Sequence, residues 1–228
     1  MISFDYSQIE LRVLAHLANV TSLIQAFNEN KDIHRHTASV VFGVSEDEVT
    51  STMRRNAKAV NFGIIYGMSD YGLAEQLGVT VKEAKSFIEK YFEKYAEIKE
   101  YMNKSIAFGK ENGYVSTVLN RKRYIPEINE KNYMRQEFGK RLAMNSPIQG
   151  SAADIIKLAM IKVDQLLKEN HMKSKMILQV HDELIFDVYE DELEQMMKLV
   201  QTGMESAYQM TVELKAEGTY AKNWYELK

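Results

Sequence analysis

The chain has 228 residues, 45% of them apolar, which is enough to bury a core in one large domain or two small ones. It contains no cysteine, so disulfides and thiolate metal sites are excluded and a reducing cytoplasm is the expected compartment. The net charge of −3 neither favours nor excludes a polyanionic partner, but residues 53–58 and 119–124 are locally basic, so one face can bind phosphate.

The N-terminal residues predict a short strand that ends at Asp5 and a helix that begins near Ser7. They show no signal-peptide pattern, and no run approaches the roughly 20 apolar residues that span a membrane. Three helices are predicted next, over residues 31–43, 45–67 and 79–113. Ser45 is the expected cap of the second, and the third is expected to run unbroken from a Thr80 cap to a stop at Gly113.

The second half of the chain predicts a hairpin around Asn120 and a helix over 131–169 that Pro147 bends or breaks. Two strand segments then meet at residues 181–183. The last elements are a helix and a terminal strand with a tail, over residues 190–210 and 211–224. Together these elements predict an α+β fold with a small antiparallel sheet and many helices.

Two aspartates stand at the ends of predicted strands, Asp5 near the N-terminus and Asp182 inside the apolar run "QVHDELIFDV". A buried unpaired carboxylate costs several kcal/mol or takes up a proton, so something must compensate for Asp182 and Glu183 there. If the two strands are neighbours, their carboxylates converge on a divalent cation such as Mg²⁺. The residues alone are also consistent with Asp5 as a helix cap and Asp182 as a turn residue.

A basic and aromatic stripe is predicted on the helix that contains "RRNAKAVNFGIIYG", where four side chains recur at every fourth residue: Arg54, Lys58, Phe62 and Tyr66. Cations near a helix N-terminus oppose its dipole, which indicates an anion against them. Gly63 and Gly67 in the same helix suggest close approach of a ligand. The alternative is a helix that buries its apolar face and leaves the cations in solvent.

A second polar stripe lies on the predicted helix over 131–169, formed by Arg141, Asn145 and Gln149. Such side chains suit hydrogen bonds to sugar, phosphate or base edges, although a capped kink around Pro147 explains them equally well. His34 and His36 form an H-x-H pair, but residues two apart on a helix face different ways, so we do not expect joint metal ligation.

Four stretches together resemble the polymerase core of the family A DNA polymerases, of the bacterial DNA polymerase I type. "DYSQIELRVLAHLA" is similar to motif A, "RRNAKAVNFGIIYGMSDYGLA" to motif B and "QVHDELIF" to motif C, while "PIQGSAADIIKLAM" resembles the palm segment between the last two. The order and spacing agree, and the resemblance runs nearly from Met1 to Lys228. It implies template-directed transfer of deoxynucleotides to a primer 3′-hydroxyl, with two Mg²⁺ ions and release of pyrophosphate, in replication and repair.

The resemblance assigns the metal ions to Asp5, Asp182 and the backbone carbonyl of Tyr6, with Glu183 in support beside them. It assigns the primer and template to four residues near the terminus: Arg141, Asn145, Gln149 and His181.

The resemblance assigns six side chains to the incoming nucleotide: Glu10, His34, Arg54, Lys58, Phe62 and Tyr66. Arg54, Lys58 and His34 contact the triphosphate, and Lys58 also donates a proton to the departing pyrophosphate. Phe62 stacks near the sugar and base, and Tyr66 occupies or vacates the template position. Glu10 blocks a ribose 2′-hydroxyl, which favours deoxynucleotides. A phenylalanine where some relatives have tyrosine implies poor acceptance of dideoxynucleotides.

The expected organisation is a helical fingers subdomain inserted in a palm. Residues 1–19 and 131–228 would form the palm and residues 20–130 the fingers, with the thumb and N-terminal nuclease domains absent. Small departures from the family pattern are "LNRKRY", where a glycine and a third arginine are common, and Ala96, where proline is usual. Neither touches the chemistry.

Because motif A begins within the first five residues, two further interpretations stay open. The chain is either a non-catalytic module that binds nucleotide or DNA, or a subunit that works only with a separate part that supplies the thumb. An incomplete sheet would also expose an edge and favour self-association.

Overall fold

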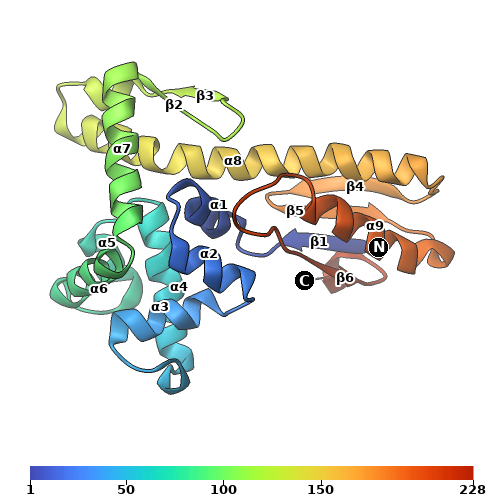
Figure 1. Ribbon diagram of the computed structural model, residues 1–228, viewed down its shortest axis with the longest axis horizontal. Helices are drawn as coiled ribbons and strands as arrows, with labels where there is room; N and C mark the ends of the chain where they lie inside the picture. Colours follow the sequence, from blue (N-terminus) through green and yellow to red (C-terminus); the bar gives the residue numbers. More distant parts are fainter. Residues whose placement is uncertain (228) are drawn as a thin grey trace.

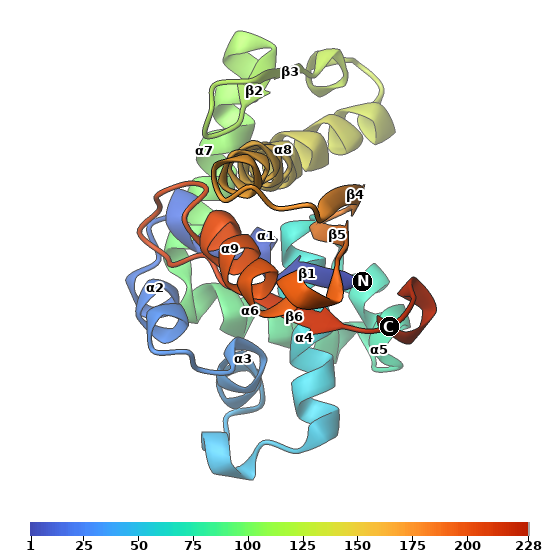
Figure 2. The same cartoon turned by 90° about the vertical axis from the view of Figure 1, so that its right-hand side faces the viewer.

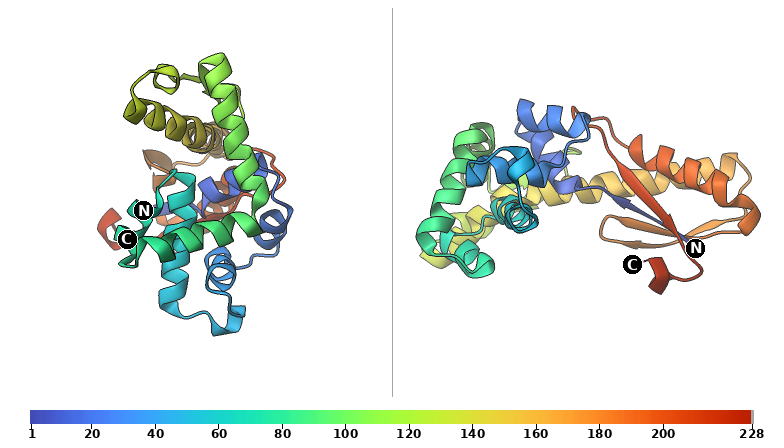
Figure 3. Two further views of the ribbon diagram at one scale, coloured as in Figure 1. Left: turned by 90° about the vertical axis from the view of Figure 1, so that its left-hand side faces the viewer. Right: turned by 90° about the horizontal axis from the view of Figure 1, so that it is seen from below.

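The computed structural model describes residues 1–227, which form a helical part at one end and a sheet with two covering helices at the other (Figure 1; Figure 3). This arrangement confirms the α+β class with a small antiparallel sheet. Within residues 1–227, no helix is sufficiently long and apolar to cross a membrane.

Four strands build the sheet in the order β4-β5-β1-β6, with each neighbour antiparallel: β1 Ile2–Tyr6, β4 Lys175–Val180, β5 Glu183–Asp187 and β6 Ala216–Tyr220. Alternation along β1 sends Ile2, Phe4 and Tyr6 into the core and Ser3 and Asp5 to the opposite face. The register places Asp5 opposite both Glu183 and Glu217. One face of the sheet is therefore apolar and the other carries acids.

Helices α8 (Tyr133–Glu169) and α9 (Leu193–Glu205) cover the apolar face, on the same side of the sheet in Figure 2. The hydroxyl of Tyr6 donates to the carbonyl oxygen of Met204 at 2.6 Å, which ties β1 to the end of α9. Gly203 allows close packing between α9 and α8, because a Cβ there would lie 2.6 Å from Val163. The helix predicted over residues 190–210 is shorter in the structure, where α9 covers Leu193–Glu205 and a separate 3₁₀ turn, Glu190–Glu192, precedes it.

Seven helices and a small hairpin make up the rest of the chain: α1 Ile9–Leu17, α2 Thr21–Asn28, α3 Ile33–Phe42, α4 Ser51–Ile65, α5 Asp70–Leu77, α6 Val81–Lys94, α7 Ala96–Asn112, β2 Tyr114–Ser116 and β3 Lys122–Tyr124. Two further 3₁₀ turns precede α4 and α8, Glu46–Glu48 and Pro126–Asn129, and another, Trp224–Leu227, closes the described chain. The hairpin confirms the prediction around Asn120, whose φ of +60° suits the tight turn. Helices α2 and α5 were not predicted from the sequence.

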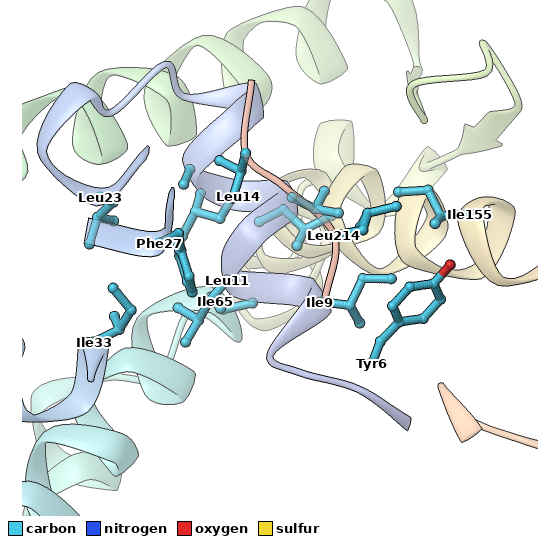
Figure 4. Packing of buried hydrophobic residues seen from close by; sticks show 14 of the residues in the cluster. Tyr6, Ile9, Leu11, Leu14, Leu23, Phe27, Ile33, Ile65, Ile155 and Leu214 are labelled. Atoms are coloured by element: carbon cyan, nitrogen blue, oxygen red, sulfur yellow. The ribbon is translucent and has the colours of Figure 1, made fainter. Parts of the chain in front are cut away.

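Helix α1 lies at the centre of the core and joins the two parts of the molecule (Figure 4). Its apolar residues meet side chains from α2, α4, α8 and the segment before β6, among them Phe27, Ile65, Ile155 and Leu214. Arg12 is also buried, and its guanidinium donates to the carbonyl oxygens of Ser7 and Glu213 at 2.8 and 2.6 Å. The start of α1 is therefore fixed against the rest of the chain on both sides.

The predicted Ser45 cap of the long helix is wrong, because α4 begins six residues later. Ser45 and Glu48 close a capping box around the 3₁₀ turn, and Thr50 caps α4 by accepting from Met53 N at 3.2 Å. Val49, between the two caps, is extended and buried against Ala38 and Ala57. Burial of Val49 in this extended conformation separates the 3₁₀ turn from α4.

The single helix predicted from Thr80 to Gly113 is also wrong: the caps are confirmed, but the run is two helices that meet at Tyr95. Tyr95 is fully buried, with its ring 4.8 Å from that of Tyr91. Both helices turn their apolar sides to the same core, so the periodicity continues across the break and does not reveal it.

A break at Pro147 does not occur, since α8 runs through it over 37 residues. An internal proline costs about 3 kcal/mol or more in a helix. The Ser151 hydroxyl donates to the Pro147 carbonyl oxygen at 2.5 Å, but this bond does not replace the one that Pro147 cannot donate to residue 143. The compensation is tertiary, because α8 buries an apolar face along most of its length.

Candidate active site

An open cavity of about 650 Å³ lies between the acidic end of the sheet and helix α4. Its lining comes from β1, α1, α3, α4, α8 and the β4–β5 turn: Asp5, Tyr6, Gln8, Ile9, Glu10, His34, Arg54, Lys58, Phe62, Tyr66, Gln149, Ala152, Ala153, His181 and Asp182. Residues more than 170 positions apart in the sequence thus share one cavity. One wall is acidic, and the opposite wall is basic and aromatic.

The acidic wall is built by the pairing of β1 with β5. Asp5 lies opposite Glu183 in the register, and Asp182 is the second residue of the two-residue turn between β4 and β5. His181, the first, has a φ of +53° and its carbonyl oxygen accepts from the Gln179 side chain at 2.6 Å. Asp182 is therefore a turn residue and also a neighbour of Asp5, as the conditional prediction required, while metal binding by the pair stays a prediction. Asp5 caps no helix, since Gln8 is the N-cap of α1.

The Asp5 carboxyl is out of its ordinary titration range. Burial, a hydrogen bond and repulsion from Asp182, and the nearby charges of Glu183 and Glu217 raise its pKa from 3.8 to about 6. Glu183 does not line the cavity and instead accepts from the Ser3 hydroxyl at 2.5 Å. The acidic wall thus concentrates negative charge that a cation would relieve.

The donor set at this wall fits a divalent ion that is shared with a substrate. No group of three or more His, Asp or Glu side chains with metal-binding geometry occurs within residues 1–227. Mg²⁺ does not need one, since it is commonly held by one or two carboxylates plus substrate phosphates and water. Asp5 and Asp182 supply two carboxylates in contact with each other. The backbone N–H of Tyr6 donates to the Asp182 carbonyl oxygen at 3.3 Å, which joins β1 to the turn.

The basic and aromatic wall is the face of α4 predicted from its four-residue spacing. Arg54 forms an ion pair with Asp32 at 2.6 Å, and Lys58 lies one turn further along. The rings of Phe62 and Tyr66 follow, stacked at 6.4 Å between centroids. The opposite face of the helix is buried in the core, as the alternative interpretation expected, while binding of an anion at the basic face stays a prediction.

Tyr66 closes the cavity against the sheet side. Its hydroxyl donates to Glu10 at 3.0 Å, and burial together with the Glu10 charge raises the pKa of Tyr66 to about 12. Gly67, which follows, needs its left-handed backbone, and a Cβ there would lie 2.7 Å from Met144. Packing within the chain accounts for this glycine, so the suggestion of close ligand approach is not needed there.

His34 and His36 have separate partners. The His34 ring is buried at the cavity, with Nδ1 bonded to the Asn61 amide at 3.1 Å, whereas His36 Nδ1 meets Glu46 at 2.7 Å. Burial, assisted by the charges of Arg54 and Lys58, lowers the pKa of His34 to about 4.

The polar stripe on α8 is only partly at the cavity. Gln149 lines it, whereas Asn145, about one turn earlier on the helix, and Arg141, about two turns earlier, do not. Arg141 is exposed, with its guanidinium 5.9 Å from the ring of Phe138. Asn145 Oδ1 is buried without a hydrogen-bond partner in the part of the chain that the structure describes, residues 1–227.

Sequence reasoning missed four residues of this region: Gln8, Asp32, Asn61 and Glu217. Gln8 adopts a left-handed conformation with φ of +53°, which no pattern predicts. Asn61 had a visible signal, since it is a polar residue on the apolar face of α4. Asp32 is near the site because it caps α3, and Glu217 because the β1–β6 register places it opposite Asp5.

Comparison with known proteins gives a consistent result. Residues 1–226 match the family described as DNA polymerase family A. The chain is 54% identical to DNA polymerase I of Caldicellulosiruptor bescii over 228 residues, and 52% identical to that of Bacillus caldotenax over 224. These matches cover 100% and 98% of the chain but 27% and 26% of the relatives, so it spans about a quarter of their length.

A solved structure is also similar, that of the POL domain of Pol1 from M. smegmatis in complex with DNA primer-template and dNTP. The TM-score is 0.93 at 45% identity, over 98% of this chain and 39% of that one.

Proposed function

The chain belongs to DNA polymerase family A, and we propose from this premise that its cavity carries out template-directed deoxynucleotide transfer. The primer 3′-hydroxyl attacks the α-phosphate of a deoxynucleoside triphosphate, a new phosphodiester bond forms, and pyrophosphate leaves. The observation that carries the proposal is the pairing of the Asp5–Asp182 wall with the Arg54–Lys58 wall across one cavity. Opposed walls of this kind suit a metal-bound triphosphate.

Asp5, Asp182 and the Tyr6 carbonyl would hold two Mg²⁺ ions, with Glu183 in support. When bound, the ions would stabilise the charge on the attacking and leaving oxygens. Without a cation, the acidic neighbours of Asp5 raise its pKa and disfavour its ionised form. A bound cation would offset those charges, so that Asp5 ionises and serves as a ligand.

The remaining assignments follow the two walls. Arg54, Lys58 and His34 hold the triphosphate, and Lys58 donates a proton to the departing pyrophosphate. Phe62 lies against the sugar and base. Its ring lacks the hydroxyl of the tyrosine found in some relatives, which would disfavour dideoxynucleotides. Tyr66 leaves the template position when the helical part moves, and that movement breaks its hydrogen bond to Glu10, which then blocks a ribose 2′-hydroxyl.

Primer and template contacts are assigned to four residues: Arg141, Asn145, Gln149 and His181. The unpartnered Asn145 Oδ1 supports this assignment, because a buried acceptor is unfavourable until a donor reaches it. We propose that residues 20–130 act as the fingers and residues 1–19 and 131–228 as the palm, in a reducing cytoplasm.

Primer extension with Mg²⁺ and all four deoxynucleotides tests the proposal. We expect Asp182→Ala to abolish extension by a preparation that extends a primer, and to leave duplex binding largely intact. Asp187→Ala, at the far end of β5, is a matched control that should keep full activity. Unchanged extension by Asp182→Ala would refute the metal assignment, and nucleotide binding without extension by the unsubstituted chain would favour a binding module.

A further inference from the structure

Helices α3 and α4 enclose a small polar cluster in an otherwise apolar contact. Asn61 is 1% exposed, Thr37 is fully buried and His34 is 4% exposed. A buried amide is costly unless its donor and acceptor are both bonded. Here the Asn61 Nδ2 lies 3.1 Å from His34 Nδ1, and the Thr37 hydroxyl donates to Asn61 Oδ1 at 3.2 Å.

This arrangement decides which ring nitrogen of His34 carries the proton. An amide NH₂ group has donors only, so His34 Nδ1 must accept and therefore has no hydrogen. In the structure the Asn61 amide presents its NH₂ group to the ring, and its oxygen accepts from the Thr37 hydroxyl. A neutral imidazole then has its hydrogen on Nε2.

The free Nε2–H group belongs to a residue that lines the cavity. Within residues 1–227, Nε2 has no hydrogen-bond partner, and the two nitrogens lie on different sides of the ring. With Nδ1 turned into the α3–α4 contact, Nε2 is the nitrogen available to a bound molecule.

The surrounding charges keep the ring neutral. Arg54 and Lys58 lie on the same wall, and together with burial they oppose a third positive charge, whereas Asp32 favours it. The pKa of His34 is accordingly lowered to about 4, which leaves the ring uncharged at pH 7. A neutral donor near two cations adds a directed hydrogen bond without adding to their repulsion.

We propose that Asn61 is a positioning residue that holds His34 as the neutral Nε2–H tautomer, so that this N–H group donates to a phosphate oxygen of a bound nucleoside triphosphate. The proposal rests on the proposed function for the identity of the ligand. The tautomer itself does not depend on it.

Nitrogen-15 NMR of the histidine side chains tests the tautomer in the full chain without nucleotide. Of the five histidines, His34 is identified as the signal lost in His34→Gln. Between pH 6 and 8 we expect a protonated Nε2 and an unprotonated Nδ1. A hydrogen on Nδ1, or a doubly protonated ring, would overturn the proposal without any substitution in Asn61.

Asn61→Asp replaces the donor by an acceptor of nearly the same shape. We expect the proton to move to Nδ1 of His34, or the ring to become doubly protonated near neutral pH. Asn56→Asp makes the same change one and a half turns earlier on α4 and should leave the His34 signals as they are. An unchanged His34 spectrum in Asn61→Asp would overturn the assigned role of Asn61.

Calorimetric titration with dTTP and Mg²⁺ tests the link to phosphate. We expect Asn61→Ala to weaken binding about tenfold, the size of one hydrogen bond to a charged group. In a His34→Gln background the same substitution should cost less than about twofold, because the ring that it orients is gone. An equal loss in both backgrounds would indicate a structural role only and would overturn the proposal.

Thermal melts establish that each variant is folded before binding is measured. A failure of the unsubstituted chain to bind dTTP would contradict the proposed function and the phosphate role of His34, while the NMR measurement would still decide the Asn61–His34 contact.

Discussion

Asp5→Asn should stabilise the metal-free chain at neutral pH, although it removes a residue assigned to catalysis. Asp5 faces Asp182, Glu183 and Glu217, and its pKa is raised from 3.8 to about 6. A carboxyl with a raised pKa in the fold favours folding when protonated, and that contribution is lost as pH rises through the folded-state pKa. Above pH 6 the native chain therefore carries an unfavourable charge that an asparagine lacks.

The size of the effect follows from the shift of roughly two pKa units. At about 1.4 kcal/mol per unit the upper limit is about 3 kcal/mol. The carboxylate is more than a third exposed, so solvent screening reduces this to about 1–1.5 kcal/mol. For a chain of 228 residues that corresponds to a rise of about 3–5 °C in melting temperature.

Thermal melts in EDTA from pH 4 to pH 8 provide the assay. The advantage of Asp5→Asn should be largest at pH 7–8 and nearly vanish at pH 4, where the carboxyl is protonated in the fold. Asp47→Asn, in an exposed 3₁₀ turn, makes the same chemical change and should shift stability by less than about 0.5 kcal/mol. Added Mg²⁺ should stabilise the unsubstituted chain more than Asp5→Asn. A gain independent of pH, or a loss at pH 8, would refute the reasoning.

Three further predictions concern stability and association. In urea titrations, Gly139→Ala should lower the free energy of unfolding by more than about 2 kcal/mol, because the new Cβ would lie 2.4 Å from the backbone of the 3₁₀ turn Pro126–Asn129. Gly63→Ala is the contrasting case: its Cβ would make contacts of 3.4 Å or more, so it should raise the free energy of unfolding by up to about 1 kcal/mol. Asp154→Ala should cost about 2–3 kcal/mol, because it leaves Thr117 and Arg121 of the hairpin without their carboxylate partner; a loss below 0.5 kcal/mol would contradict this. Strand β4 lies at an edge of the sheet, and Ile177 on it is 52% exposed. We therefore expect the chain to self-associate with rising concentration, and Ile177→Lys to reduce this association in analytical ultracentrifugation. Equal association by the substituted and unsubstituted chains would refute the prediction.

The sequence predicted the parts of the site that are periodic or adjacent in the chain. The four-residue spacing from Arg54 to Tyr66 placed them on one face of α4, and the apolar run around Asp182 predicted the two strands that meet beside it. The pairing of those strands with β1 was expected only conditionally, because strand order depends on long-range packing.

What the sequence did not predict depends on contacts between distant segments. The helix break at Tyr95 leaves no trace in the hydrophobic pattern, because both helices face the same core. The continuity of α8 through Pro147 required burial that only the folded chain supplies. Asn61 was visible as a polar residue, but its partner His34 lies 27 positions away on another helix.

The pairing of β1 with β5 in one register has a consequence for how genes of this kind can change. Asp5 and Glu183 point to one face of the sheet, and their immediate neighbours Phe4 and Leu184 point to the other. Deleting or inserting one codon in either strand would exchange the two faces, burying an acid under α8 and exposing a core side chain. These two segments can therefore vary by replacement but not in length.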